Sequence, residues 1–532
     1  MNSPIKIIDL FSGPGGLGEG FSALKDSDGN PMFKIATSIE KEKSAHATLK
    51  LRAFYRQFGE SVPEEYYEFL KGKLGSKPEE QLYTLFESEH KVASEEALCL
   101  TLGKDNKEIY SSIKKSIGED ECILIGGPPC QAYSLAGRSR NMGIKDYDAK
   151  EDHRNFLYLE YLKVIAKFQP KLFVMENVKG MLSAKVDGKP IFDSIYRDLK
   201  NPCTSAKTKP EGLRKKHKYK LFSLVSDNSN IEDIKREPRE FIIESEKFSV
   251  PQRRHRVIIL GIREDLAHNW DDKFLLNTGS KEVTVADMLE GLPHLRSGLS
   301  KIKNHTENDW KDAVFSVKDT VLPALIKSKN KQHKIVAKEI KTILKGFKLP
   351  VHEQGKVFGL KANKIQTGNL KLNDWIHAPR LNRHIANNET RNHIITDLYR
   401  YLFCSAWAVC AKREDWSTIT PKSKDYTKEL VPNHVNFSTG KFADRFRVQA
   451  SHIAATTITS HISKDGHYYI HPDPMQCRSL TVREAARIQT FPDDYFFVGN
   501  RTEQYVQVGN AVPPFLATQI SLTVSKFLNK KK

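Results

Sequence analysis

The sequence of 532 residues predicts an α/β protein with a doubly wound sheet, and three observations indicate this fold. Apolar runs typical of buried strands alternate with helix-prone segments from residue 1 to about residue 265. The first strand runs into a glycine-rich turn, and a later strand runs into a rigid turn that carries a cysteine. At this length the chain is expected to form more than one domain.

The first predicted strand, Ile5 to Leu10, precedes a turn in which Gly13, Gly15 and Gly18 have the spacing G-x-G-x-x-G. Such a strand-to-helix turn lets a nucleotide approach the backbone closely. The next predicted strand, Phe33 to Ile39, ends in Glu40, whose carboxylate is placed to accept hydrogen bonds from ribose hydroxyls. The pattern predicts a cofactor that contains adenosine, and both a dinucleotide and S-adenosylmethionine fit it.

A cysteine follows the buried run Cys122 to Ile125, in the segment Gly126-Gly127-Pro128-Pro129-Cys130-Gln131. Prolines fix φ and remove backbone donors, so the backbone sets the position of the Cys130 thiol. Open α/β sheets build their active sites at the carboxyl ends of strands. Cys130 is therefore a candidate nucleophile.

Three further segments place polar residues beside buried strands. Lys171 to Val178 is an apolar run that ends in Glu176 and Asn177, and if it is parallel to the preceding strand, Glu176 and Cys130 open onto the same sheet edge. Gln252, Arg254 and Arg256 lead into the buried run Val257 to Gly261, where arginines are poorly explained as a solvated surface. Near the C-terminus stands Gln507-Val508-Gly509-Asn510-Ala511-Val512-Pro513-Pro514.

Together these segments resemble the DNA (cytosine-5) methyltransferase family of bacterial restriction-modification systems. The matching motifs occur in the family's order between residues 5 and 517: Asp9 to Gly16, Pro128 to Gln131, Glu176 to Val178, Gln252 to Arg256, Arg478 to Asp493 and Gly509 to Val512. The resemblance implies a Rossmann-like methyltransferase domain that uses S-adenosylmethionine, with a smaller, mixed target-recognition domain. It also implies an activity: transfer of a methyl group to carbon 5 of a cytosine in a specific duplex DNA sequence.

Site residues follow from the same resemblance, together with the chemistry of their side chains. The expected catalytic residues are Cys130, Glu176, Arg254 and Arg256. The expected cofactor-binding residues are Phe11, Gly13, Gly15, Gly16, Glu40, Asp105, Pro128, Asn510 and Val512. The expected DNA contacts are Gln131, Ser134, Arg138 and Arg140; the last three lie within a loop from Ala132 to Lys150 that is suited to close over DNA.

The chemistry requires these residue types. Carbon 5 of cytosine is a weak nucleophile until a thiolate, assigned to Cys130, adds at carbon 6. Glu176, protonated or sharing a proton with the base, would neutralise N3, and Arg256 would hold O2. A positive environment helps the thiolate, and Arg138, Arg140 and Arg254 are candidates for it. The target base must be flipped out of the duplex to reach Cys130.

The predicted catalytic domain covers residues 1–265 and 478–532, with a charged, helical insertion at about 51–118. Residues 266–477 form the predicted target-recognition domain, with basic stretches at Lys327 to Lys334 and Arg380 to His384 and a helix near Thr396 to Arg413. The helix at Thr481 to Gln489 is expected to brace this domain against the core. Asn201 to Lys220 is polar and basic, which predicts an exposed loop.

Composition is consistent with a DNA-binding enzyme, since the formal net charge is +19. The seven cysteines show no metal-ligand spacing, so no metal is expected and the thiols are expected to be reduced. The apolar run at Ile5 to Phe11 contains Asp9 and lacks a basic leader, so we expect no signal peptide and no membrane partner. A monomer in a bacterial cytoplasm, associated with the nucleoid and paired with a separately acting restriction endonuclease, is the expected setting.

Three alternatives stay open at this point. An NAD-dependent oxidoreductase would use the same glycine-rich turn and Glu40, but it leaves Cys130 and Arg256 unexplained. An RNA cytosine methyltransferase shares the motifs, although the long interval 266–477 favours duplex DNA. A catalytically silent DNA-binding relative is disfavoured because Cys130, Glu176 and Arg256 are all present.

Overall fold

The computed structural model describes residues 3–129, 153–186, 188–212, 214–228, 237–279, 281–350, 354–433 and 445–530. Five predicted site residues, Cys130, Gln131, Ser134, Arg138 and Arg140, lie outside the described residues, as does the whole loop predicted to close over DNA. The turn that leads into Cys130 is described as far as Pro129.

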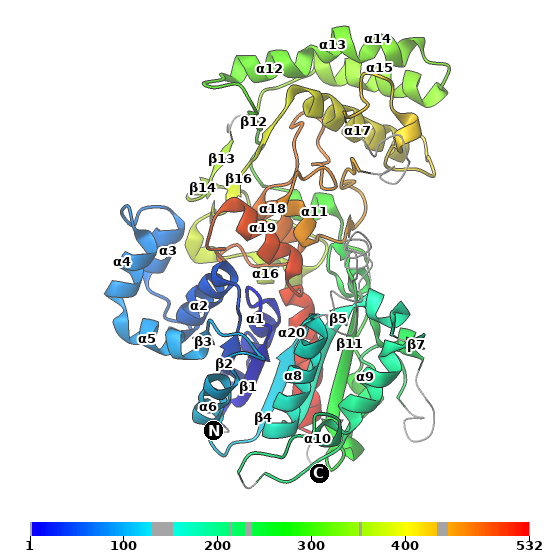
Figure 1. Ribbon diagram of the computed structural model, residues 1–532. Helices are drawn as coiled ribbons and strands as arrows, with labels where there is room; N and C mark the ends of the chain where they lie inside the picture. The colour runs from blue at the N-terminus through cyan, green and yellow to red at the C-terminus, as the bar shows by residue number, and fades with distance from the viewer. Residues whose placement is uncertain are drawn as a thin grey trace.

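A central sheet of eight strands organises the lower half of the molecule (Figure 1). Its strands run in the order β3-β2-β1-β4-β5-β11-β8, and β9 also pairs with β11. β11 is antiparallel to β5, β8 and β9, while β3, β2, β1, β4 and β5 are mutually parallel. The bounds are β1 Ile5–Leu10, β2 Phe33–Ile39, β3 Ala97–Leu98, β4 Cys122–Gly126, β5 Leu172–Val178, β8 Tyr219–Phe222, β9 Ile242–Glu244 and β11 His255–Arg263.

The predicted strands are confirmed, because their apolar runs are buried between helices on both faces. Every residue of β4 is buried, and β1 and β2 are buried over their last residues. In the register of the sheet, Gly126 pairs with Leu10 on one side and with Met175 on the other. The parallel pairing of β4 and β5 is therefore confirmed, and Glu176 and the turn after Gly126 open onto the same sheet edge.

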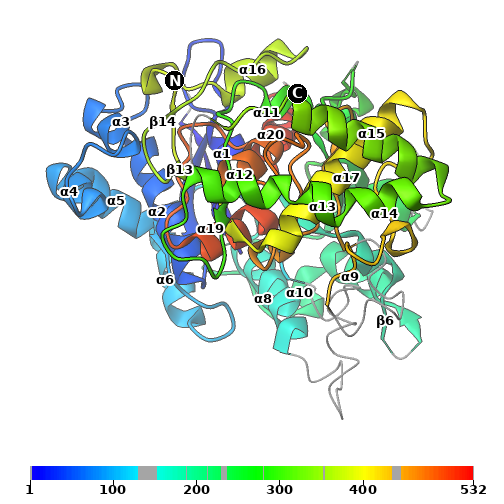
Figure 2. The same ribbon diagram turned by 90° about the horizontal axis from the view of Figure 1, so that it is seen from above.

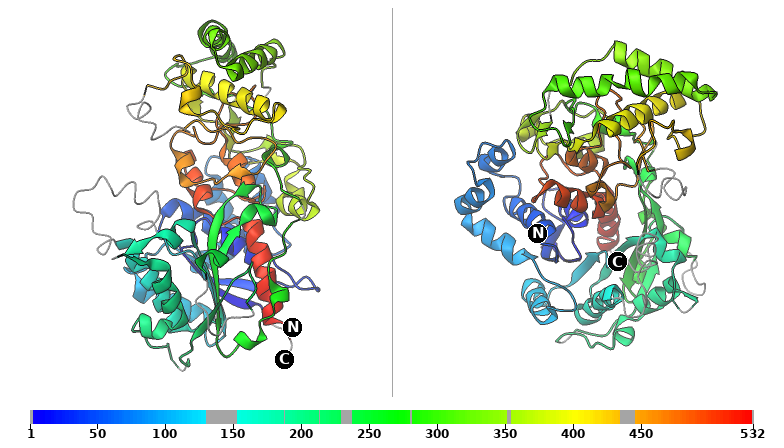
Figure 3. Two further views of the ribbon diagram at one scale, coloured as in Figure 1. Left: turned by 90° about the vertical axis from the view of Figure 1, so that its right-hand side faces the viewer. Right: turned by 45° about the horizontal axis from the view of Figure 1, so that its top comes forward.

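Helices cover both faces of the sheet (Figures 1 and 3). On one face, α1 (Gly16–Ser22) packs against α20 (Pro514–Leu528), the last helix of the chain. A Cβ atom on Gly20 would lie 2.4 Å from Cβ of Ala517, so the glycine permits this close packing. The opposite face is covered by α6 (Asn106–Ile117), α8 (His153–Phe168) and α9 (Ile191–Lys200).

The interval 51–118 lies between two strands of the central sheet. It contains the end of α2 (Lys43–Gln57), then α3 (Glu64–Leu70), α4 (Pro78–Leu85), α5 (Glu87–Glu96) and α6. It also contains β3, which pairs with β2 and so extends the sheet. Aromatic side chains hold α2 to α5 together, and Phe69 also packs on Phe358 and Phe496 from distant parts of the chain.

Residues 201–220 depart from the sequence prediction of an exposed loop. Pro202–Ser205 forms the short helix α10, and Tyr219 begins strand β8. Cys203 and Tyr219 are buried, and the Tyr219 hydroxyl donates 2.8 Å to the carbonyl oxygen of Pro170. The prediction of a loop rested on the lysines of this segment. Strand β8 at its end has only four residues, too few to stand out as an apolar run.

The chain leaves the core of the sheet only after Leu276, which is buried there together with Ala267. The upper part of the molecule then has its own core, formed by helices that Figure 2 shows from above. These are α12 (Glu307–Phe315), α13 (Val317–Thr320), α14 (Leu322–Lys327), α15 (Lys331–Lys345) and α17 (Ile395–Arg413). The helix predicted near Thr396 to Arg413 is thus confirmed as α17.

Short elements join the two parts of the molecule. Two-residue strands pair as β10 (Gln252–Arg253) with β18 (Ala455–Thr456), β12 (Gly298–Leu299) with β17 (Asn392–His393), β13 (Gly355–Lys356) with β16 (Asn388–Glu389), and β14 (Leu360–Lys361) with β15 (His384–Ile385); β6 (Lys185–Val186) and β7 (Lys189–Pro190) form a further hairpin on the sheet side. The joining helices are α11 (Val285–Leu289), α16 (Leu370–Ile376), α18 (Val482–Ile488) and α19 (Arg501–Asn510). Helix α18 confirms the helix predicted at Thr481 to Gln489. Within the described ranges, no helix is both long enough and apolar enough to traverse a bilayer.

Candidate active site

The glycine-rich turn joins β1 to α1 with two glycines in the left-handed region. Gly13 has φ of 57° and Gly15 has φ of 97°, values that residues other than glycine rarely adopt. The Tyr495 hydroxyl donates a hydrogen bond to the carbonyl oxygen of Pro14. A Cβ atom on Gly16 would lie only 2.3 Å from the carbonyl oxygen of Val512. The turn is therefore closed from above by a segment near the C-terminus.

Glu40 stands directly beside this turn. One carboxylate oxygen accepts from the backbone N–H of Gly13 at 2.8 Å, and the other accepts from the N–H of Glu42 at 2.8 Å. Burial raises the pKa of Glu40, and these backbone hydrogen bonds oppose the shift. Around the position of a Cβ on Gly13 there is open space for 4 Å, so a ligand could lie between the turn and the carboxylate.

The other predicted cofactor residues do not all lie beside this turn. Phe11 has φ of 55° at the end of β1 and packs against the sheet's core. Asn510 is exposed at the last residue of α19, and Val512 meets Gly16 as described. Asp105 instead lies at the start of α6, where its carboxylate accepts from the N–H of Thr101 at 2.8 Å.

The residue that follows β3 at the sheet edge is Cys99. Its thiol lies 3.8 Å from the carbonyl oxygen of Lys41, the residue next to Glu40. Cys99 is exposed, whereas the other described cysteines are buried.

Glu176 and Arg256 face one another across β5 and β11. The guanidinium Nε of Arg256 lies 2.9 Å from Oε1 of Glu176, and both side chains are about one-seventh exposed, at 13% and 15%. A Cβ on Gly127 would lie 2.8 Å from Oε2 of Glu176, so this glycine lets the carboxylate sit over the turn that leads to Cys130. Burial lowers the pKa of Arg256, and the charge of Glu176 opposes that shift.

Asn177 fastens the start of the same turn. Its side-chain amide donates 3.0 Å to the carbonyl oxygen of Pro128, which is the predicted cofactor residue of this loop. Its own amide oxygen accepts from the N–H of Val178 at 2.8 Å. The end of β5 therefore fixes both Glu176 and the backbone that precedes Cys130.

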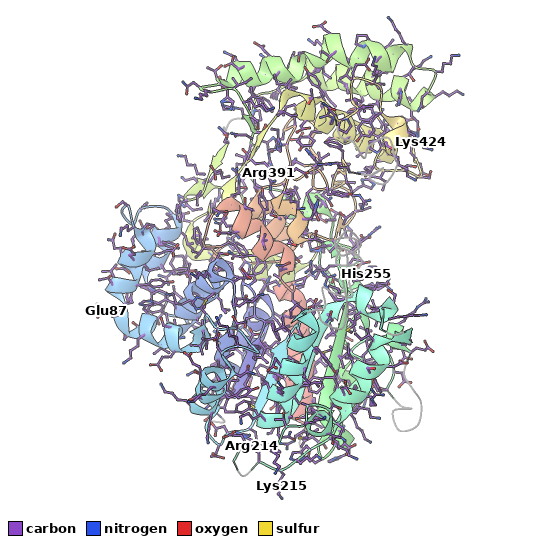
Figure 4. All side chains as sticks on the ribbon, viewed as in Figure 1. Glu87, Arg214, Lys215, His255, Arg391 and Lys424 are labelled. Atoms are coloured by element: carbon purple, nitrogen blue, oxygen red, sulfur yellow. The ribbon has the colours of Figure 1, made fainter. Side chains whose placement is uncertain are left out.

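Arg254 is buried near the pair, but its partners are carbonyl oxygens. Its guanidinium donates to Ile458 at 2.6 Å and to Gly509 at 3.1 Å. Burial lowers the pKa of Arg254 well below its usual range, and the like charge of Arg256 adds to this effect. Figure 4 labels His255, the residue between the two arginines, where β11 meets the upper part of the molecule. Arg254 lies between β10 (Gln252–Arg253) and β11 and belongs to neither strand, which is consistent with its surroundings differing from those of Arg256.

Gln252 completes a set of contacts that the sequence did not reveal. It accepts from the N–H of Ile458 at 2.6 Å and donates to the side chain of Gln489 at 3.0 Å. Gln489 in turn donates to the carbonyl oxygen of Val508 at 2.7 Å. These glutamines tie the strand before Arg256 to the ends of α18 and α19.

Asp9 was also missed, although it stands within the glycine-rich motif. It is fully buried, one of its carboxylate oxygens has no hydrogen-bond partner, and burial raises its pKa to about 8. An acid among the buried apolar residues Ile7, Ile8 and Leu10 was the signal that could have found it. Among the described residues, no cluster of three or more His, Cys, Asp or Glu side chains could hold a metal ion.

A doubly wound sheet with a nucleotide-type turn at one strand end and a carboxylate–guanidinium pair at another defines the class of a Rossmann-like methyltransferase. The model of the C-5 cytosine-specific DNA methylase family matches residues 93–201 and 230–526, well over half of the chain. The chain therefore belongs to the C-5 cytosine-specific DNA methylase family.

Relatives and a solved structure agree with this assignment. The chain is 31% identical to the type II methyltransferase M.Bpa9945I of Bacillus paralicheniformis over 98% of this chain and 99% of that protein. It is 23% identical to the type II methyltransferase M.AgeI of Thalassovita gelatinovora over 98% and 99% of the two chains. A crystal structure of a DNA modification methyltransferase encoded within an E. coli prophage shares the fold, with a TM-score of 0.51 and 17% identity over 99% of this chain and 100% of that one.

The enzyme is accordingly a DNA (cytosine-5-)-methyltransferase, and its methyl donor is S-adenosylmethionine. The site fits this cofactor. Open space lies beside Gly13, and the Glu40 carboxylate can accept from two neighbouring hydroxyls. The buried and unpartnered carboxylate oxygen of Asp9 beneath the turn also suits a ligand that carries positive charge.

Proposed function

We propose that the enzyme methylates a flipped-out cytosine within one specific duplex DNA sequence, by way of a covalent adduct with Cys130, as the modification enzyme of a restriction-modification system. The observation that carries this proposal is the Glu176–Arg256 ion pair above the turn that leads to Cys130. A carboxyl and a guanidinium at this spacing match the N3 and O2 edge of a cytosine.

In the free enzyme, each of these two groups is the other's partner. An incoming cytosine would insert its N3–O2 edge at the pair, so that Glu176 faces N3 with a proton and Arg256 faces O2. Neutralising the ring at both positions favours addition of the Cys130 thiolate at carbon 6, which makes carbon 5 nucleophilic. Once carbon 5 has taken the methyl group, water removes its remaining proton and the carbon 6–sulfur bond breaks, which restores the aromatic ring and the Cys130 thiolate.

The cofactor is proposed to lie between the glycine-rich turn and Glu40. Gly13, Gly15 and Gly16 would present backbone to it, and Glu40 would accept from its ribose hydroxyls. Phe11, Asp105, Pro128, Asn510 and Val512 are the further proposed contacts. When bound, S-adenosylmethionine supplies a methyl group on a positively charged sulfur.

The DNA is proposed to be read by residues 266–477. The loop from Ala132 to Lys150 would close over it through Ser134, Arg138 and Arg140, and Gln131, just before this loop, would contact it as well. The formal charge of +19 supports attraction to phosphates. The catalytic domain is proposed to comprise residues 1–265 and 478–532, and one copy of the chain suffices for the chemistry. The cognate endonuclease would act separately on unmethylated copies of the same sequence.

Bisulfite sequencing of plasmid DNA from cells that express the wild-type enzyme or Cys130→Ser tests this proposal. Protected cytosines in a single sequence context, absent with Cys130→Ser, are the expected result. Cys203→Ser, on the short helix α10, is a matched control, and it should leave the pattern of protected cytosines in place. Unmodified plasmid together with methylated transfer RNA in the wild-type cells would favour an RNA substrate instead.

A further inference from the structure

Arg52 is a buried arginine on α2 to which the proposed methyl transfer assigns no role. Only 6% of its side chain is exposed, and the same fraction is exposed for Glu19, in the first turn of α1. Arg52 donates to both carboxylate oxygens of Glu19, at 3.0 Å from Nε and at 2.6 Å from Nη2. The fork of this guanidinium therefore fastens α2 to the helix that begins at the glycine-rich turn (Figure 1).

The same guanidinium also reaches Asp494, which lies far away along the chain. Its Nη1 lies 3.2 Å from Oδ1 of Asp494, whose side chain is 10% exposed. The second carboxylate oxygen of Asp494 accepts from the Tyr55 hydroxyl at 3.0 Å, and its backbone carbonyl oxygen accepts from the Tyr66 hydroxyl at 3.3 Å. Asp494 is thus held by three side chains of α2 and α3.

Tyr495, the next residue, extends these contacts to the glycine-rich turn. Its ring centre lies 4.9 Å from the guanidinium carbon of Arg52, and the ring centre of Tyr55 lies 3.8 Å from the same atom. The Tyr495 hydroxyl donates to the carbonyl oxygen of Pro14, and its oxygen would lie 3.0 Å from a Cβ atom on Gly15. Arg52 therefore contacts both the residue that closes the turn and the helix that follows the turn.

Position is a better explanation of this charged cluster than stability. Buried ion pairs typically add little stability over an apolar core of the same shape. The turn contains Gly13 and Gly15 at positive φ, and glycine loses more conformational freedom than any other residue when its backbone is fixed. A turn that is already held in one conformation avoids this entropic cost when a ligand binds.

We propose that Arg52 is a positioning residue for the methyl donor. It holds Glu19 and Tyr495, so that the backbone from Pro14 to Gly16 has its binding conformation before S-adenosylmethionine is bound. Arg52 acts through the turn. Its loss should therefore weaken binding of the methyl donor and leave the rate of transfer by the donor-bound enzyme unchanged. The inference rests on the place proposed for S-adenosylmethionine beside the turn.

Calorimetric titration of S-adenosylmethionine into the free, full-length enzyme tests this role. Arg52→Lys keeps the positive charge, but one ammonium cannot replace a fork that contacts two carboxylates, so the Kd for S-adenosylmethionine should rise at least ~10-fold. Arg52→Met also removes the charge and should bind more weakly still. Arg56 lies 3.9 Å from Glu19 and continues to offset its charge in both variants.

A split between affinity and rate separates positioning from a merely structural role. With saturating plasmid DNA, the KM for S-adenosylmethionine should rise in Arg52→Lys, whereas kcat should stay within ~2-fold of the wild-type value. Arg263→Lys is the matched control, because Arg263 also contacts two carboxylates, Glu121 at 3.0 Å and Asp265 at 3.1 Å, at the opposite end of β11 from Arg256. Its Kd for S-adenosylmethionine should equal that of the wild type.

Two results would overturn the proposal. One is a wild-type Kd in both Arg52 variants, and the other is an equal rise of Kd in Arg52→Lys and Arg263→Lys. Tyr495→Phe keeps the ring against Arg52 and removes only the hydroxyl that donates to Pro14, so it should fold and raise the Kd as well. An unchanged Kd in Tyr495→Phe contradicts the proposal even if Arg52→Met fails to fold.

Failure of the proposed function gives a different result. A wild-type enzyme that binds S-adenosylmethionine, with the expected loss in Arg52→Lys, but methylates no cytosine in DNA would refute the proposed function and leave the role of Arg52 standing. Glu40→Ala tests the place of the methyl donor. If this variant binds S-adenosylmethionine as tightly as the wild type does, the proposed place is wrong and the role of Arg52 is refuted with it.

Discussion

The Arg256 guanidinium lies 2.9 Å from the Glu176 carboxylate because β11 runs antiparallel to β5, with Ile258 opposite Glu176 and Arg256 opposite Val178. Two paired strands of the sheet, β5 and β11, therefore hold the two side chains together without a ligand. Side chains on paired central strands are held more firmly than side chains on loops, which suits groups that must meet a reacting base.

Replacing Glu176 with glutamine should slow methylation far more than it weakens DNA binding. The amide keeps the shape of the carboxyl but cannot provide a proton at N3, and loss of general acid catalysis typically costs about 10²–10⁴-fold in rate. Single-turnover transfer of tritiated methyl groups and a gel-shift assay measure the two quantities. Glu244→Gln, on strand β9 of the same sheet, is the control, and an unimpaired rate in Glu176→Gln would remove the assigned role.

Replacing Arg254 with alanine should chiefly lower the stability of the fold, whereas replacing Arg256 with alanine should chiefly lower the rate of methyl transfer. Arg254→Ala leaves the carbonyl oxygens of Ile458 and Gly509 without their buried donors, and we expect a loss of about 2–4 kcal/mol in the free energy of unfolding. Cofactor affinity should fall with it, since Gly509 leads into Asn510. Arg256→Ala should chiefly slow methyl transfer. Urea denaturation and a cofactor titration separate the two, and similar unfolding curves for both variants would contradict the distinction.

The glycines of the turn should differ in their tolerance of a methyl group. Gly16→Ala would place Cβ 2.3 Å from the carbonyl oxygen of Val512, so the C-terminal segment must move. A cost of about 1–3 kcal/mol and weaker cofactor binding are expected. Gly13→Ala meets open space, although its φ of 57° is unfavourable, and should cost about 1 kcal/mol. Thermal unfolding of both variants, with and without cofactor, makes the comparison.

Asp9 should make the ligand-free enzyme less stable as the pH rises. Burial raises its folded pKa to about 8 from an ordinary 3.8, so between these values the folded state binds more protons than the unfolded state. Stability is then lost at up to about 1.4 kcal/mol per pH unit across this window. Asp9→Asn lacks this titration, so its advantage over the wild type should grow from pH 4 to pH 8 and then level off. Parallel urea titrations at several pH values would show no such growth if Asp9 stays ionised.

Local patterns predicted most of the sheet and one side of the site. The strands at Ile5 and Cys122 could be predicted because both are short apolar runs bounded by glycines, and parallel pairing then brought Glu176 beside the turn after Gly126. The contact between Tyr495 and Pro14 joins residues at opposite ends of the chain, and no local pattern reports it. The carbonyl partners of Arg254 could not be predicted for the same reason. The sequence shows that this residue is charged, but not which distant backbone oxygens it contacts.

The same long-range contact bears on how the enzyme is made. Helix α1 packs on α20, and Tyr495 and Val512 close the turn that α1 begins, so the proposed donor site is completed by residues that are translated long after the turn itself. The nascent N-terminal half would hold its strands with one face of the sheet uncovered. High contact order of this kind slows folding. Newly synthesised chains should thus lack donor affinity until Tyr495 and Val512 have been translated and α20 has packed on α1, so methyl transfer would lag behind the synthesis of the N-terminal strands.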